Sequence, residues 1–277
     1  METQPSAAPD IADLRALLEA VFARYGLDFR SYSYASLKRR VMRQVAAEKT
    51  ENIPNLQAMI LADSACMGRL LAALTIHVTA MFRDPAFYRV LRTEVMPVLR
   101  TYPFLRVWVA GCSTGEEVYS LAILLHEEGL YERCRIYATD LNETVLEKAR
   151  AGVFPISAMR EYTQNYQNAA GRAAFAEYYT ADSDSVVFRP FLRQNVIFAA
   201  HNLACDASFN EFHLILCRNV MIYFDRSLQD RVHKLFHESL AQYGYLGLGR
   251  AETVRFSSCE NCYEAVSMKE RLYRKIR

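Results

Sequence analysis

Three acidic residues follow two predicted strands and could bind a positively charged ligand. Glu116 and Glu117 come directly after the turn Gly111-Cys-Ser-Thr-Gly115, and Asp140 ends an apolar run that starts at Ile136. The glycines let a ligand approach the backbone, and in a nucleotide-binding βαβ unit an acid at the end of the second strand receives ribose hydroxyls. Two carboxylates at the turn repel phosphate and attract a cation. The pattern favours a nucleoside with a positive centre, and S-adenosylmethionine, with its sulfonium and ammonium groups, fits.

The glycine spacing of this turn argues against a phosphate-bearing ligand. The turn is neither Gly-x-Gly-x-x-Gly nor the lysine-bearing phosphate loop, so a nicotinamide-dependent oxidoreductase is disfavoured. A similar glycine turn also follows strands in α/β proteins that hold no ligand there. The strand-end acid Asp140 is what favours a ligand site over a purely structural turn.

Alternating strands and helices from residue 106 onward must position these acids. Apolar runs predict strands at 106–110, 135–140, 195–200 and 212–217, and periodicity of three and four predicts helices at 115–128, 142–151 and 227–242. This alternation predicts a parallel sheet with crossover helices, closed by an edge from residues 246–249 and 271–276. Residues 157–194 interrupt the alternation with a helical stretch (160–178) and a strand with a turn (185–193), which predicts a small inserted β-subdomain.

The first 76 residues contain no strand candidate and predict a separate all-α domain, so that the domains are 1–76 and 77–277. Residues 1–9 are predicted to be a disordered tail. Helices are expected after Asp10 and after Ser36 as capping residues, then from Pro54 to 62 and from 67 to 74. A further helix is predicted from Asp84-Pro85 to about residue 99. Arg83 precedes that helix, an unfavourable place for a cation, and is expected to face a carboxylate.

The second predicted helix places cations opposite an apolar face formed by Leu37, Val41 and Val45. A charged face of this kind is commonly only solvated, but four cations within six residues also suit an acidic partner. The four cations are Lys38, Arg39, Arg40 and Arg43.

Composition limits the remaining possibilities. The chain has 277 residues, 52% of them hydrophobic, and a net charge of +2, so that nothing global demands nucleic acid. No apolar stretch is long enough to span a bilayer, and no secretion signal is visible. Cys112, Cys134 and Cys217 fall in predicted strands or at strand ends as small buried residues, and Cys259 and Cys262 lack further ligands at zinc spacing. We therefore expect a cytoplasmic protein with reduced thiols and no metal site.

Several motifs together resemble the chemotaxis receptor methyltransferases of the CheR type, over nearly the whole chain from about residue 10. The most specific is Cys217-Arg-Asn-Val-Met-Ile-Tyr-Phe224. The others, in matching order and spacing, are Val78-Thr-Ala-Met-Phe-Arg-Asp-Pro85, Ala110-Gly-Cys-Ser-Thr-Gly-Glu-Glu117, Ala138-Thr-Asp140 and Asn202-Leu203. The resemblance implies a Rossmann-like α/β methyltransferase sheet with a small inserted β-subdomain, preceded by an all-α domain with a basic second helix.

The resemblance also implies an activity and a set of roles. Members transfer a methyl group from S-adenosylmethionine to glutamate side chains on the cytoplasmic helices of chemoreceptors, leaving S-adenosylhomocysteine. Arg83 and Tyr223 are implied in catalysis. The resemblance also favours the cations of the second helix as a binding surface for acidic receptor helices; these are Lys38, Arg39, Arg40 and Arg43. The resemblance implies that Glu117 binds the ammonium group of the cofactor, Asp140 its ribose, and Asn202 and Leu203 its adenine. The other residues implied to line the cofactor are His77, Thr79, Arg83, Arg218 and Asn219. A monomer without membrane insertion is expected.

The sequence departs from the family pattern at a few positions. The family commonly has Asn at the position of His77, Phe at that of Met81 and Pro at that of Val118. Some members also dock a receptor's C-terminal peptide on the β-subdomain by strand addition. The hairpin turn Thr180–Ser185 is short and lacks glycine here, so we expect that tether to be weak or absent. A non-catalytic adaptor that keeps the cofactor pocket is the alternative function; intact Arg83, Glu117, Asp140 and Tyr223 argue against it.

Overall fold

The computed structural model describes residues 7–75 and 79–277, with side chains from residue 11. The chain divides into two compact units. The first comprises Met1–Ile76 with Tyr223–Gln229, and the second comprises His77–Ile222 with Asp230–Arg277. A seven-residue segment thus leaves the second unit and folds with the first.

Four helices form the first unit: α1 (Ala7–Tyr25), α2 (Tyr34–Ala47), α3 (Ile53–Ala62) and α4 (Ser64–Leu74). Two expected helix starts are wrong, because α1 already contains Asp10 and α2 begins two residues before Ser36. Residues 7–9 of the expected tail are helical, and residues 1–6 lie outside the described part. Buried apolar side chains such as Leu14, Leu17 and Val41 pack these helices together. The side chains of Asn52 and Asp63 cap α3 and α4.

The segment Tyr223–Gln229 joins this unit through its backbone. The Ser33 N–H donates to the Tyr223 carbonyl at 2.8 Å, and the Asp225 N–H donates to the Ser31 carbonyl at 2.9 Å. Between them Tyr32 and Phe224 form an antiparallel bridge, with their rings 4.8 Å apart. The motif that contains Tyr223 therefore ends inside the helical unit.

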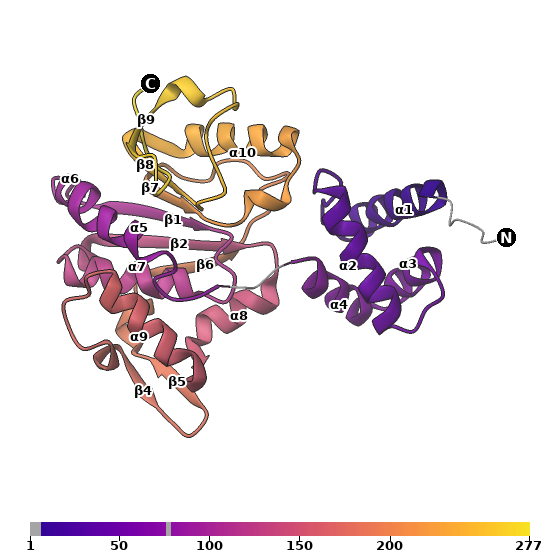
Figure 1. Cartoon of the computed structure of the whole chain (residues 1–277), viewed down its shortest axis with the longest axis horizontal. Coiled ribbons are helices and arrows are strands. Elements are labelled where there is room, and N and C mark those ends of the chain that lie inside the picture. The colour runs from indigo at the N-terminus through magenta and orange to yellow at the C-terminus, as the bar shows by residue number, and fades with distance from the viewer. Residues whose placement is uncertain (1–6, 76–78) are drawn as a thin grey trace. The chain divides into compact units, whose positions relative to one another are not determined.

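A seven-stranded sheet organises the second unit (Figure 1). Its order is β6-β2-β1-β7-β8-β10-β9, in which β6 to β8 run parallel and β10 is antiparallel to both of its neighbours. The four strands predicted in the parallel part are present. The strand bounds are β1 (Leu105–Ala110), β2 (Cys134–Asp140), β6 (Val196–Ala200), β7 (Phe212–Cys217), β8 (Leu240–Leu248), β9 (Tyr263–Ser267) and β10 (Leu272–Lys275).

The predicted end of the sheet needs correction. β8 starts at Leu240, directly after α10 (Arg226–Ser239), so the predicted helix to residue 242 is three residues too long. β8 and β10 do pair antiparallel, but β9, which was not predicted, pairs with β10 and forms the edge. Only Tyr263 of β9 is fully buried, which explains why its sequence carries no apolar alternation.

Alternate residues of β1 face opposite layers of the unit. Val107 and Val109 belong to the core cluster that also contains the buried apolar residues of α7 (Glu116–Glu127). Trp108 points to the other face, where its ring lies 5.4 Å from that of Phe236 on α10. Cys112, Cys134 and Cys217 are buried as predicted.

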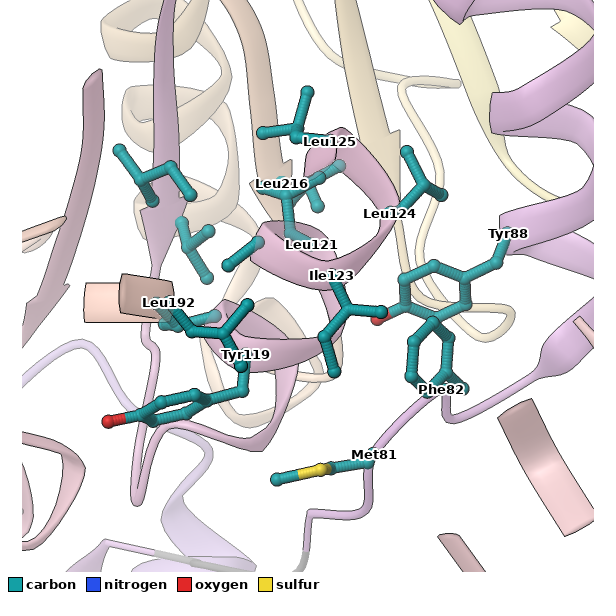
Figure 2. Packing of buried hydrophobic residues seen from close by; sticks show 14 of the residues in the cluster. Met81, Phe82, Tyr88, Tyr119, Leu121, Ile123, Leu124, Leu125, Leu192 and Leu216 are labelled. Carbon is teal, nitrogen blue, oxygen red and sulfur yellow. The ribbon is translucent and has the colours of Figure 1, made fainter. Parts of the chain in front are cut away.

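The core against α7 also includes the predicted helix after Asp84. This helix comprises α5 (Pro85–Val90), a π-helical turn (Leu91–Val95) and α6 (Met96–Leu99). Figure 2 shows Ile123 of α7 beside Phe82 and Tyr88, whose rings are 5.0 Å apart. The chain before α5 is therefore anchored on α7.

A second, three-stranded antiparallel sheet has the order β3-β5-β4, with β3 (Val153–Pro155), β4 (Tyr179–Ala181) and β5 (Ser185–Phe188). It follows α8 (Glu143–Ala151) and encloses α9 (Met159–Asn168) in the sequence. The single helix predicted for 160–178 is wrong, because α9 stops at Asn168 and only a 3₁₀ turn, Phe175–Tyr178, follows. Within residues 7–75 and 79–277, every helix is too short or too polar to span a bilayer.

Candidate functional site

The turn between β1 and α7 is attached to the end of β2. The N–H groups of Gly111 and Cys112 both donate to the Thr139 carbonyl, at 2.8 and 2.9 Å. Gly111 has a φ of +73°, and a Cβ there would lie 2.4 Å from Cγ2 of Val220. Three loops, which follow β1, β2 and β7, therefore meet at the carboxyl edge of the sheet, where α/β proteins bind ligands.

Asp140 is held in place by backbone donors from two of these loops. Its carboxylate accepts the Ser113 N–H at 2.9 Å and the Asn142 N–H at 3.0 Å. An ionised carboxylate accepts hydrogen bonds at both of its oxygens, which is the chemistry that ribose hydroxyls require. The predicted ribose acid is thus at the turn, with its carboxylate oriented by the backbone.

Glu117 is paired with Arg218. Its Oε1 accepts Nη1 of Arg218 at 2.7 Å and the Tyr88 hydroxyl at 3.4 Å. Nη2 of the same guanidinium donates to Asp84 at 2.8 Å and to the Arg83 carbonyl at 3.0 Å, and the group lies 4.2 Å from the centre of the Phe87 ring. The Arg218 side chain is 3% exposed, so that it is a buried cation whose two terminal nitrogens bond acceptors and whose face lies on an aromatic ring. Its buried Nε has no hydrogen-bond partner among the described residues.

Glu116 has a different environment from its neighbour. Its carboxylate accepts the Thr114 hydroxyl at 2.6 Å and the Tyr162 hydroxyl at 3.3 Å, and burial raises its pKa. The expectation that both glutamates attract a cation therefore needs correction for Glu116, which links the turn to α9. The electrostatic argument for a cationic ligand depends on Glu117.

The loop after β6 brings the predicted adenine residues to the same edge. The His201 N–H donates to the Asp140 carbonyl at 3.1 Å, so this loop starts beside the ribose acid. Asn202 is buried and accepts the Ala204 N–H at 2.9 Å, while its Nδ2 has no hydrogen-bond partner in the described part of the chain. Leu203 is 7% exposed and supplies an apolar surface.

The predicted residues before α5 are only partly placed. His77 lies outside the described residues. Thr79 and Arg83 are half-buried on either side of Phe82, whose N–H donates to Ser120 of α7 at 2.8 Å. Asp84 follows Arg83 and was not assigned to the site from the sequence. Its carboxylate forms ion pairs with Arg218 and, at 3.4 Å, with Arg250.

The turn after β7 holds a second group of polar atoms. Asn219 has a φ of +62°, and its buried Oδ1 has no partner among the described residues. Glu252 accepts the N–H groups of Asn219, Val220 and Met221. Glu252 was not predicted from the sequence. Gly249, three residues earlier, is the nearest sequence feature that could have indicated a close backbone contact in this loop.

The cation cluster and Tyr223 belong to the helical unit. Arg40 is 5% exposed, donates to the Leu74 carbonyl and lies 4.9 Å from the centre of the Tyr223 ring. Burial lowers the pKa of Arg40. Its expected place on the charged face is therefore wrong, because α2 buries Arg40 together with Val41. Arg39 and Arg43 are exposed, and Lys38 is half-buried.

The cofactor predicted for this edge fits the residues present. Glu117 offers a carboxylate for an ammonium group, Asp140 one for ribose hydroxyls, and two buried amides have an atom without a partner, Nδ2 of Asn202 and Oδ1 of Asn219. Buried polar atoms of this kind are normally satisfied, which favours a polar ligand. Across residues 7–75 and 79–277, no group of three or more His, Cys, Asp or Glu side chains could hold a metal ion.

Two family models match the chain. The model described as CheR methyltransferase, SAM binding domain, matches residues 77–271, and the one described as CheR methyltransferase, all-alpha domain, matches residues 12–75. S-adenosylmethionine is thus the cofactor of this chain.

Two relatives match this chain over most of their own length. A Pseudomonas putida protein named Cher3 is 49% identical, over 95% of this chain and 96% of its own. The chemotaxis protein methyltransferase of Salmonella typhimurium is 31% identical, over 90% of this chain and 86% of its own. Among solved structures, the N-methyltransferase NodS from Bradyrhizobium japonicum in complex with S-adenosyl-L-homocysteine is 13% identical, with a TM-score of 0.40, over 72% of this chain and 90% of that one.

Proposed function

The chain belongs to the CheR methyltransferase family, and on this premise we propose that it transfers a methyl group to glutamate side chains on the cytoplasmic helices of chemoreceptors. The products are glutamate methyl esters and S-adenosylhomocysteine. The observation that carries the proposal is the convergence of Glu117, Arg218 and Asp140 at the carboxyl edge of the sheet.

The acceptor needs alignment more than activation. A glutamate carboxylate is already ionised near neutral pH, so the reaction needs no strong general base. The bound cofactor supplies the methyl group on a sulfonium, a good leaving group. The protein has to place the carboxylate oxygen in line with the methyl carbon and sulfur, and to remove water from the carboxylate.

We assign these tasks to Arg83 and Tyr223. The Arg83 guanidinium can hold the acceptor carboxylate through two parallel hydrogen bonds. The Tyr223 hydroxyl can fix the second carboxylate oxygen. At the cofactor, Glu117 takes the ammonium group and Asp140 the ribose, Asn202 and Leu203 border the adenine, and His77, Thr79, Arg218 and Asn219 complete the lining.

Exposed cations on α2 fit an acidic receptor helix. Arg39 and Arg43 are exposed and Lys38 is half-buried, so these three can face a partner, whereas Arg40 is buried against Tyr223. Opposite charges across an interface raise the association rate and fix the register of the partner. In this proposal residues 1–76 bind the receptor, residues 77–277 carry the chemistry, and the protein acts as a cytoplasmic monomer.

Transfer of a labelled methyl group tests the proposal. The protein is incubated with methyl-labelled S-adenosylmethionine and cytoplasmic fragments of chemoreceptors from the same organism. We expect label on the fragment that mild base releases as methanol, because methyl esters are base-labile. An acceptor fragment with Ala at the methylated glutamates is the control and should take up no label.

Two results would contradict the proposal. Label that survives mild base would indicate methylation of nitrogen or sulfur. Cofactor binding without transfer to any receptor fragment would instead favour an adaptor that keeps the cofactor pocket.

A further inference from the structure

One buried carboxylate organises the turn after β7. Glu252 is 4% exposed and lies in the loop that follows β8. Its Oε1 accepts the N–H groups of Val220 at 2.8 Å and Met221 at 2.7 Å. Its Oε2 accepts those of Asn219 at 2.9 Å and Gly249 at 2.6 Å. Three successive backbone donors of one turn thus end on a single side chain from another loop.

An ionised carboxylate suits this position better than an amide. Four N–H donors need four acceptor lone pairs, which a carboxylate has and a carboxamide oxygen lacks. No lysine or arginine within the described residues forms a salt bridge with Glu252. Burial raises the pKa of Glu252, and its four backbone donors oppose that rise by stabilising the charged form. The backbone donors of the turn therefore stabilise the charged form of Glu252, and Glu252 in return holds these donors in place.

Contacts on two sides confine the turn. Asn219 has a φ of +62°, in the left-handed region that asparagine adopts more readily than most side chains do. A Cβ at Gly249 would lie 2.7 Å from the Asn219 nitrogen and 2.7 Å from Oε2 of Glu252, so residue 249 packs directly on this contact. On the other side, Val220 packs against Gly111 of the cofactor turn. Glu252 thus connects the loop after β8 with the loop after β1 through the turn after β7.

The two residues at the start of the turn are the ones assigned to the cofactor. Arg218 bonds Glu117, and Asn219 presents a buried Oδ1 without a partner among residues 7–75 and 79–277. We propose that Glu252 is a positioning residue of the methyl-transfer site, which sets Arg218 and Asn219 toward the cofactor without touching it. This inference rests on the proposed assignment of those two residues to the cofactor.

Binding of S-adenosylhomocysteine to Glu252→Gln tests the proposal. We expect the affinity measured by calorimetry to fall roughly tenfold or more, because at least two of the four donors lose their acceptor. Hydrogen exchange of the Asn219–Met221 amides should accelerate in the same variant. Glu260→Gln is the matched control: Glu260 lies in the same loop, but among the described residues its carboxylate accepts one N–H, that of Phe256 at 2.8 Å. It should change neither quantity.

A double-mutant cycle separates positioning from general stability. If Glu252 acts through Asn219, Asn219→Ala and Glu252→Gln together should weaken binding by less than the product of their separate effects. The proposal would be overturned if the two substitutions together weakened binding by the full product of their separate effects. Unchanged amide exchange in Glu252→Gln would also overturn it. So would wild-type affinity in that variant.

Gly249→Ala covers the case in which Glu252→Gln does not fold. It crowds the same contact from the opposite side and should also weaken S-adenosylhomocysteine binding; wild-type affinity would count against the proposal. The proposed function fails separately, if wild-type protein binds the cofactor but methylates no receptor glutamate. The binding results for Glu252 would stand in that case.

Discussion

Arg218 and Glu117, which are 101 residues apart in the chain, form a 2.7 Å ion pair at the carboxyl edge of the sheet. Glu117 was predicted to bind the ammonium group of the cofactor, and Arg218 to line the same cofactor. Their pairing means that a guanidinium already holds this carboxylate in position. The Glu117 carboxylate has further lone pairs for an ammonium group, so the pair orients the acceptor before the ligand arrives.

Replacing Glu117 by Gln should therefore weaken binding of S-adenosylmethionine roughly 10- to 100-fold, because a charge-assisted hydrogen bond is lost. Isothermal calorimetry measures the affinity, and urea unfolding measures the accompanying loss of the buried ion pair. Glu116→Gln is the control, since Glu116 bonds Thr114 and Tyr162 and should leave the affinity within about threefold. Equal losses in both variants would show that general disturbance of the turn causes the effect.

Local patterns were sufficient to predict the parts of the fold that place the cofactor. The apolar runs at β1 and β7 are buried in central parallel strands, where a continuous apolar run is the usual pattern, and β2 is buried at most of its positions. The apolar run at β6 predicts its strand equally well, although β6 lies at the edge of the sheet and none of its residues is fully buried. Asp140 could be predicted because a strand-end acid beside a glycine turn is a local signal. The edge strand β9 is mostly exposed and carries no such signal.

Tertiary contacts determine the features that the sequence did not predict. Arg40 occupies a helix position beside apolar Val41, but only the fold shows that the segment containing Tyr223 covers it. Glu252 resembles any surface acid in the sequence; its importance comes from three amides more than 30 residues earlier in the chain. Hydrogen bonds from distant backbone N–H groups produce no periodic pattern in the sequence, so they cannot be predicted from it.

Gly111→Ala should disrupt the cofactor edge. Residue 111 has a φ of +73°, and an added Cβ would lie 2.4 Å from Cγ2 of Val220. Backbone strain and this clash should together lower the free energy of unfolding by about 1–3 kcal/mol and weaken cofactor binding. Urea unfolding and calorimetry measure the two effects. Val220→Ala in the Gly111→Ala background removes the clash and should restore part of the affinity; no recovery would assign the whole effect to backbone strain.

The buried carboxylate of Glu116 should make stability depend on pH. Burial raises its pKa above the ordinary value of 4.5, so that the folded protein binds a proton more readily than the unfolded chain does. The contribution of Glu116 to the free energy of unfolding therefore falls as pH rises from about 4.5 through the folded pKa. The total fall is about 1.4 kcal/mol for each unit by which folding raises the pKa.

Glu116→Gln removes this contribution, because an amide does not titrate. Urea unfolding of both proteins between pH 5 and about pH 8 should show that the variant gains stability relative to wild type as pH increases, and that the gain then levels off. The difference between the two proteins cancels the other titrating groups. A constant difference across this range would show that Glu116 keeps an ordinary pKa in the fold.

Arg40 and its exposed neighbours should affect different kinetic constants. Arg40 lies 4.9 Å from the centre of the Tyr223 ring and bonds the Leu74 carbonyl, so Arg40→Gln should lower kcat by loosening Tyr223 and should destabilise the helical unit by about 1–3 kcal/mol. These effects should be the same at low and high salt, because the guanidinium is buried.

Arg39→Gln and Arg43→Gln should instead raise KM for a receptor fragment, and the rise should shrink as salt screens the exposed charges. Steady-state methyl transfer at about 50 and 500 mM salt distinguishes the two patterns. A salt-dependent KM effect of Arg40→Gln with unchanged kcat would show that Arg40 contacts the receptor directly.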